Sequence, residues 1–191
     1  MLYIPPTTPD RYVSSIVALN IISPDGTGDW HSAGSLHDNA FPEDIYIYGE
    51  GQKKNTNDLL GRDGIIDGTA RLNRMGYFPE NAPVWLADHP RACVDLLYTT
   101  VLQDGILGTV MLDEWFPAPE DKQAVYRLLD KMEPHLSSSE KENLTLWKKR
   151  TPYCNPDREN SISRNKPWEH FGISRATWYR RGKPMPSKTK K

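Results

Sequence analysis

The sequence has few cysteines and no long hydrophobic run. Cys93 and Cys154 stand far apart and lack the CxxC spacing of a zinc site, so we expect reduced thiols and no disulfide framework. No segment approaches the roughly 18 consecutive apolar residues of a membrane-spanning helix. Residues 1–8 also lack the charged start and apolar core of a signal peptide. We therefore expect a cytoplasmic protein without a membrane partner.

Positive charge is scarce over most of the chain and concentrated at its end. The net charge is only −1, but residues 148–191 contain 13 lysines and arginines against three acidic residues, a net of +10. Residues 1–147 therefore have a net charge of −11. The basic end can release counterions from nucleic-acid phosphates, whereas the acidic part is repelled by them. This division predicts different partners for the two parts.

A change in composition separates the two parts. Residues 151–165 contain Pro152 and Pro156 together with serine, threonine and asparagine, and they have little apolar content. This composition is typical of a linker. We predict an acidic body over residues 1–150, which binds a partner or self-associates, then a linker over 151–165, and a small all-α unit with a basic tail over 166–191.

The body mixes strand patterns with helix patterns, which favours an α+β or small α/β fold with a short mixed sheet. β-Branched or alternating apolar residues predict strands over residues 11–22, 44–48, 84–87 and 105–112. Short, buried, partly helical pieces are expected over 59–66. Amphipathic spacing predicts helices over 69–75, with Gly76 as C-cap, over 90–102, with Asp88 as N-cap, and over 119–132 and 137–150.

Residues 166–184, KPWEHFGISRATWYRRGKP, have the pattern of two helices joined by a tight corner. Trp168 and Phe171 lie three residues apart and so share a helix face. Gly172 follows them, and glycine is the residue that best tolerates a left-handed backbone at a helix end. Ser174 is a good N-cap for the second helix, over residues 175–181, whose outward side chains are mainly arginine, threonine and tyrosine. Such a face suits phosphates and base edges in a DNA major groove.

The same residues resemble a known family. Phe171-Gly172-Ile173, followed after three residues by Thr177-Trp178-Tyr179-Arg180, is similar to the C-terminal helix-turn-helix of serine recombinases of the Hin invertase and resolvase type. Small regulators of mobile elements share this unit. The resemblance implies that Ala176, Tyr179 and Arg180 face the DNA, although the family often has a hydroxyl residue where Ala176 stands. It also implies that a basic tail, here residues 182–191, runs along the minor groove.

The motif and the resemblance together define a set of expected DNA-binding residues. They are Ser174, Arg175, Ala176, Thr177, Tyr179, Arg180, Arg181, Lys183, Lys188, Lys190 and Lys191. The expected partner is double-stranded DNA, which implies association with the nucleoid. One two-helix unit contacts too few base pairs for tight binding, so we expect a dimer or higher homo-oligomer that binds paired half-sites.

A serine recombinase is not expected, although the chain has a similar length. Residues 11–15 are similar to the arginine-valine-serine start of those enzymes, whose serine is the nucleophile, but Tyr12 separates the arginine from the valine. The only cations in residues 15–70 are Lys53, Lys54 and Arg62. A phosphoryl-transfer site with so little positive charge would leave the developing negative charge unneutralised.

Two groups of acidic and histidine residues have the side chains of a metal or acid–base site. They are Asp29, His31, His37, Asp38, Asp113 and Glu114. Turn formation and surface exposure explain the same residues, because no further histidine motif completes a ligand set. We therefore expect no catalytic residue, metal or cofactor. The alternative is a metal-dependent enzyme that acts on nucleic acid or nucleotides and is targeted by its helix-turn-helix. Its metal ligands would be Asp29, His31, Asp113 and Glu114.

The leading hypothesis is a sequence-specific DNA-binding transcriptional regulator. An antitoxin-like autorepressor of a mobile or toxin–antitoxin locus fits the layout, with the acidic body binding a protein partner such as a cognate toxin. This assignment is an analogy of architecture, because no motif in the body carries it. A third hypothesis is an interaction protein whose basic tail binds nucleic acid without sequence preference.

Overall fold

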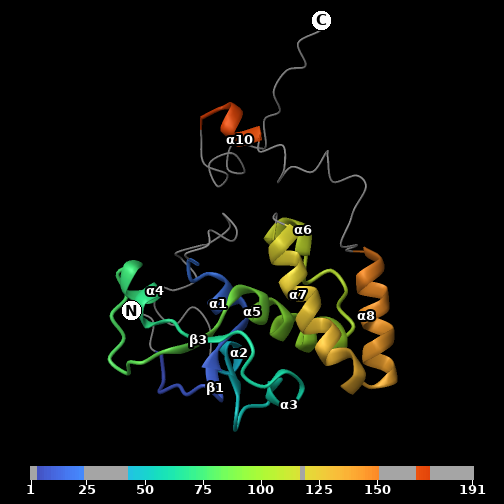
Figure 1. The fold of residues 1–191 in the computed structure, drawn as a ribbon, viewed down its shortest axis with the longest axis horizontal. Helices are drawn as coiled ribbons and strands as arrows, with labels where there is room; N and C mark the ends of the chain where they lie inside the picture. Colours follow the sequence, from blue (N-terminus) through green and yellow to red (C-terminus); the bar gives the residue numbers. More distant parts are fainter. Residues whose placement is uncertain (1–3, 24–42, 117–118, 151–166, 173–191) are drawn as a thin grey trace, which may run out of the picture.

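A small mixed β-sheet and the helices packed against it form the body of the protein (Figure 1). The computed structural model describes residues 4–23, 43–116, 119–150 and 167–172. The strands are short, as expected for α+β: β1 (Arg11–Val13), β2 (Ile47–Gly49), β3 (Ile65–Asp67) and β4 (Trp85–Ala87). Their order is β2-β1-β4-β3, with a parallel β1–β4 pair at the centre and antiparallel pairs at both edges.

The strand register directs polar groups to one face of this sheet and apolar groups to the other. Tyr12 pairs with Tyr48, so the two phenol rings lie on the same face. Val13 pairs with Leu86, and Leu86 pairs with Ile66, on the opposite face. Tyr12, Tyr48, Val13 and Leu86 are fully buried. Both faces of the central strands are therefore covered by other parts of the body.

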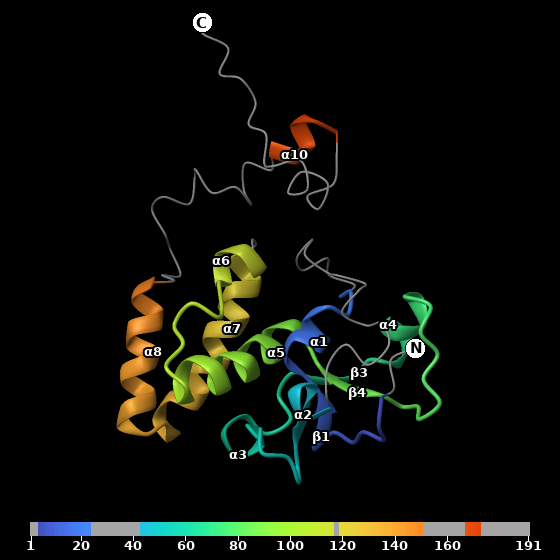
Figure 2. The ribbon, with the colours of Figure 1, turned by 180° about the vertical axis from the view of Figure 1, so that it is seen from behind.

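The helices complete the body. Helix α5 (His89–Leu97) contacts the sheet at β4 and packs against both α1 (Ser15–Leu19) and α7 (Pro119–Met132). Seen from either side, α7 and α8 lie on the far side of α5 from α4 (Figures 1 and 2). The other elements are α2 (Glu43–Tyr46), α3 (Asn57–Leu60), α4 (Thr69–Arg74), η2 (Tyr98–Gln103), α6 (Leu112–Trp115), η3 (Glu133–His135), α8 (Ser138–Arg150) and α10 (Pro167–His170).

The helices with the clearest end signals were predicted correctly. Helix α7 has the predicted bounds, and α8 starts one residue later than predicted. Gly76, after α4, has a φ of 82°, the left-handed value expected of a C-cap glycine. Asp88 caps α5 as predicted, because its Oδ1 accepts a hydrogen bond from the Arg91 amide at 2.8 Å. The predicted helix over 90–102 continues from α5 into the six-residue π-helix η2.

The strand predicted over residues 11–22 is wrong beyond Val13. The chain turns at Ser15, which has a φ of 57°, and continues as helix α1. Three successive residues of this helix, Val17, Ala18 and Leu19, are buried. A helix buried on all sides shows no amphipathic period, so its apolar run cannot be told from a buried strand by pattern alone.

Two further strand predictions need correction. Over 44–48 the first residues form α2, whose first turn carries Glu43 and Asp44, and only the end belongs to β2. Over 105–112 the chain forms turns, and residue 112 begins α6. A strand requires a neighbouring strand as hydrogen-bond partner, and here the Val110 carbonyl instead accepts a hydrogen bond from Trp147 Nε1 at 3.1 Å.

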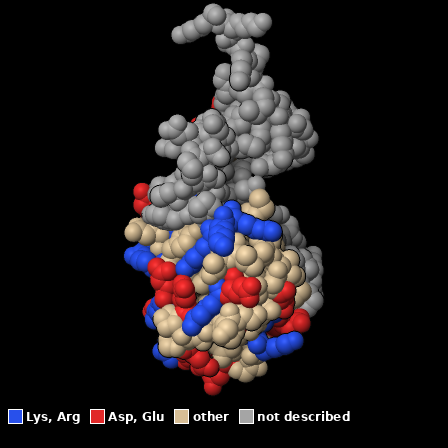
Figure 3. All heavy atoms as spheres, turned by 90° about the vertical axis from the view of Figure 1, so that its right-hand side faces the viewer, with Lys and Arg blue, Asp and Glu red and all other residues tan. Residues whose placement is uncertain are grey.

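The charged side chains of the body surface are partly paired. Arg62 contacts Asp10 at 2.6 Å, and Lys131 contacts Asp63 at 2.6 Å. On the side of the body that carries α8, acidic and basic side chains are interspersed with uncharged surface (Figure 3). No helix within the described ranges is long and apolar enough to cross a membrane.

Candidate functional site

The predicted DNA-binding unit begins with the short helix α10. The Phe171 amide donates to the Trp168 carbonyl at 3.1 Å, and the Gly172 amide donates to the Glu169 carbonyl at 3.0 Å. Gly172 has a φ of 62°, the left-handed backbone that the sequence predicted for the corner. Trp168 is 5% exposed and Phe171 is 40% exposed, so the two aromatic residues differ in burial.

The expected DNA-binding residues all lie beyond this corner, outside the described ranges. They are Ser174, Arg175, Ala176, Thr177, Tyr179, Arg180, Arg181, Lys183, Lys188, Lys190 and Lys191. The predicted linker over 151–165 lies outside them as well. DNA contact by these residues therefore remains a prediction from the sequence.

The acidic and histidine residues of the alternative metal site are only partly within the described chain. Asp29, His31, His37 and Asp38 lie outside the described ranges. The backbone of Asp113 and Glu114 belongs to helix α6. Turns precede this helix, whereas the interpretation of the two residues as a site assumed a strand before them. Among the described residues, no three histidine, cysteine, aspartate or glutamate side chains are grouped to hold a metal ion.

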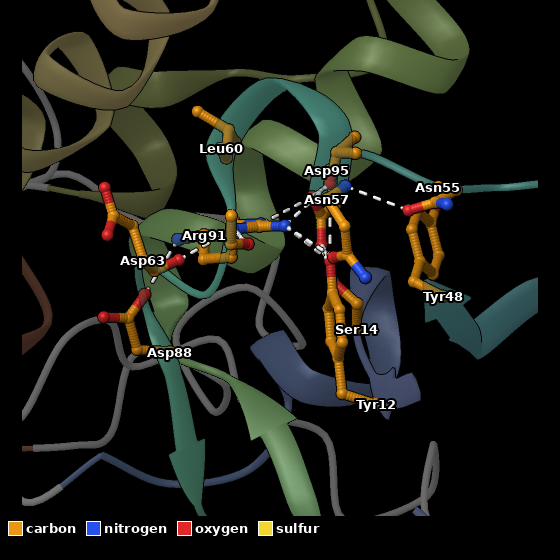
Figure 4. A network of polar contacts seen from close by, with 12 residues as sticks. Tyr12, Ser14, Tyr48, Asn55, Asn57, Leu60, Asp63, Asp88, Arg91 and Asp95 are labelled. Atoms are coloured by element: carbon orange, nitrogen blue, oxygen red, sulfur yellow. Dashed lines mark hydrogen bonds and ion pairs between the residues drawn. The ribbon is translucent and has the colours of Figure 1, made fainter. Parts of the chain in front are cut away.

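A different cluster of polar side chains lies in the core of the body (Figure 4). It is centred on Arg91 and Asp95, which are four residues apart on α5 and therefore share a face of that helix. Arg91 Nε donates to Asp95 Oδ1 at 2.9 Å, and neither side chain has any solvent exposure. The helix thus presents an ion pair, and not an apolar stripe, to the polar face of the sheet.

The guanidinium group of Arg91 uses all of its donors. Nη1 donates to the backbone carbonyls of Gly61 and Asp63 at 3.1 and 2.8 Å. Nη2 donates to the Tyr12 hydroxyl at 2.7 Å and to Thr56 Oγ1 at 2.9 Å. With the bond from Nε to Asp95, these contacts satisfy the five N–H groups that an arginine side chain has. A ligand could bind this arginine only by displacing an existing partner.

Three hydroxyl groups complete the environment of Asp95. Its Oδ2 accepts hydrogen bonds from Ser14 Oγ at 2.6 Å and from the Tyr12 hydroxyl at 3.1 Å, and its Oδ1 accepts one from Thr56 Oγ1 at 2.5 Å. No buried polar side-chain atom in the described chain lacks a hydrogen-bond partner. Full satisfaction of this kind is what makes a buried charge tolerable.

The buried charges change the ionisation of their neighbours. Burial, reinforced by the negative charge of Asp95, raises the pKa of Tyr12. Burial alone would lower the pKa of Arg91, but the attraction of Asp95 and Tyr12 outweighs it and the pKa is raised. Tyr12 is therefore a neutral donor and Arg91 a cation at physiological pH.

This network is a structural clamp and not a binding site with free groups. It joins β1 to α5 and to residues 55–64, which contain α3 and the turns on either side of it and are far from both in sequence. The network was not predicted from the sequence. The available signal was the arginine and aspartate at a spacing of four in a helix predicted to be amphipathic, but the same spacing is common for exposed pairs.

Searches for related proteins return no family to which the chain can be assigned. Neither family models, nor curated proteins, nor solved structures match it.

Proposed function

We propose that the protein is a sequence-specific DNA-binding transcriptional regulator. In this proposal, residues 166–191 bind double-stranded DNA as a helix-turn-helix with a basic tail, and the acidic body binds a protein partner. An antitoxin-like autorepressor of a mobile or toxin–antitoxin locus, with a cognate toxin as partner, is the specific form that we favour.

The observation that carries the proposal is the concentration of positive charge around the corner at Gly172. Residues 148–191 have a net charge of +10, and the left-handed backbone of Gly172 agrees with the turn that the motif requires. A basic unit behind a proline-containing linker is the electrostatic pattern of a nucleic-acid-binding module.

Two features of the body bear on the choice between the regulator and the enzyme. Arg91 and Asp95, its fully buried ion pair, have all their hydrogen-bonding groups occupied within the protein. The alternative, a metal-dependent enzyme, would use Asp29, His31, Asp113 and Glu114, and the strand that was expected to lead into Asp113 and Glu114 is not formed by residues 105–112. The acidic part of the chain, residues 1–147 with a net charge of −11, suits a basic protein partner.

Gel-shift titrations of the full chain test the DNA part of the proposal. The probes are the DNA upstream of the protein's own gene and a scrambled duplex, compared at one fixed salt concentration. We expect Arg180→Ala to weaken binding to the specific DNA by about 1–3 kcal/mol, if it makes a bidentate base contact. The matched control Lys190→Ala should weaken binding to both probes alike and reduce the salt dependence. Equal affinity of the unaltered protein for both probes would leave only nonspecific binding.

A repression assay tests the autorepressor part. A reporter driven by the protein's own upstream DNA should be repressed by the intact chain and released by Arg180→Ala. Coexpression with the product of the neighbouring gene should yield a stable complex that survives Arg180→Ala, because the partner binds the body. Absence of both repression and complex formation would remove the antitoxin interpretation.

A further inference from the structure

Helix α8 has an exposed face with a regular order of charge and apolar side chain. Glu142, Leu146 and Lys149 are spaced by four and three residues, so they lie on one face of the helix. All three are exposed, and Leu146 is 40% exposed. The opposite face carries Leu144 and Trp147, which are buried in the core. The exposed face is therefore not the one that holds α8 on the body.

The segment that runs beside α8 carries two further exposed apolar side chains. Asn143 Nδ2 donates to the Leu102 carbonyl at 2.9 Å, and Trp147 Nε1 donates to the Val110 carbonyl at 3.1 Å, so residues 102–110 run along the helix. Ile106 and Met111, in and next to this segment, are 57% and 46% exposed. Ile106, Met111 and Leu146 are thus three of the six large hydrophobic side chains exposed in the described chain, and all three lie on α8 or on the segment that precedes α6.

The charges on this face are complementary to those of a second copy. In an antiparallel pair of α8 helices related by a two-fold axis near Leu146, Glu142 of each copy lies opposite Lys149 of the other. A parallel pair would place like charges opposite each other. Within one copy, neither Glu142 nor Lys149 forms an ion pair or hydrogen bond with any residue in the described part of the chain. An isologous contact of this kind satisfies both charges twice and covers Leu146.

We propose that Glu142, Leu146 and Lys149, on the exposed face of α8, form a homodimer interface. The need for two copies rests on the proposed function, since one two-helix unit binds DNA weakly. The geometry agrees with paired half-sites. With the two-fold axis near Leu146, the C-terminal ends of the two helices lie about 15 Å apart, and a 15-residue linker reaches up to roughly 50 Å. Two DNA-binding units can therefore occupy half-sites about 34 Å apart.

Charge reversal with restoration tests the interface in the full chain. Sedimentation velocity over a wide range of concentrations should show a reversible dimer. Glu142→Lys and Lys149→Glu should each weaken it by about tenfold or more, because each places like charges opposite each other twice. The double variant Glu142→Lys/Lys149→Glu should restore the dimer. Leu146→Asp should weaken it at least as strongly, because it removes the central apolar contact.

Two exposed residues on the α4–β4 loop, remote from α8, supply matched controls (Figure 1). Phe78→Asp and Glu80→Lys make the same chemical changes and should leave dimerisation unchanged, and circular dichroism verifies that every variant is folded. A protein that stays monomeric at all concentrations, a dimer insensitive to Leu146→Asp, or a double variant that fails to restore the dimer would overturn the interface. A dimer that responds as expected but binds no DNA would overturn the proposed function and leave the interface standing.

Discussion

Removing the guanidinium group of Arg91 should destabilise the body strongly. Arg91→Met keeps most of the side-chain stem but deletes five N–H donors. Asp95 is then left as a buried charge without a counterion, and the carbonyls of Gly61 and Asp63 lose their donor. Breaking a buried ion pair by removing one partner costs about 3–5 kcal/mol. We expect the free energy of unfolding to fall by about that amount, a large part of the roughly 5–15 kcal/mol that stabilises a typical domain.

An exposed ion pair of the same type provides the control. Arg62 contacts Asp10 at 2.6 Å, but their side chains are 65% and 40% exposed, so Arg62→Met should destabilise the body far less than Arg91→Met does. Urea denaturation followed by tryptophan fluorescence measures both variants, and an unchanged slope shows that they unfold from the same state. If Arg91→Met lowers the free energy of unfolding no more than Arg62→Met does, the buried network does not hold β1 and residues 55–64 to α5.

Two further predictions concern the same body. Burial raises the pKa of Tyr48 to about 12, whereas a tyrosine in the unfolded chain has a pKa near 10. Between pH 10 and pH 12, the folded state therefore keeps a proton on Tyr48 that the unfolded state has lost. The stability that this proton provides is complete below pH 10 and is lost as the pH rises towards 12. Tyr48→Phe should make the free energy of unfolding fall less steeply over this pH range. An unchanged dependence on pH would contradict the raised pKa of Tyr48. Gly68→Ala should destabilise by about 1–3 kcal/mol, because an added Cβ would meet Leu86 Cδ2 at 1.7 Å. Gly108→Ala, where an added Cβ meets nothing within 4 Å, should change stability by less than about 1 kcal/mol, and equal losses in urea denaturation would refute the packing argument.

The elements that could be predicted are those whose signals are local. Helix α7 starts with proline and acidic residues and ends near Lys131, and α8 begins with a capping box in which Ser137 and Glu140 exchange hydrogen bonds. These signals need no knowledge of the rest of the fold. The segments 11–22 and 105–112 were assigned wrongly because their state depends on what surrounds them: burial on all sides in the first, and the absence of a neighbouring strand in the second.

The central polar network could not be predicted for the same reason. Its members come from β1, from the loop before and after α3, and from α5, and only the fold brings them together. The spacing of Arg91 and Asp95 is also common for exposed pairs, whereas both have no exposure in the structure. The corner at Gly172 is of the other kind, because it depends on residues that are adjacent in the chain, whereas DNA binding stays a prediction.

The network also has a consequence for how the body folds. The Tyr12 hydroxyl and the Arg91 guanidinium are 79 residues apart in sequence, and Ser14 and Asp95 are 81 residues apart. Closing a loop of that length costs roughly 4 kcal/mol of chain entropy before any contact is gained. Long-range contacts of this kind slow folding. During synthesis, the hydroxyl groups of Tyr12 and Ser14 have no charged partner until α5 has left the ribosome. The body should therefore become stable late and in one cooperative step.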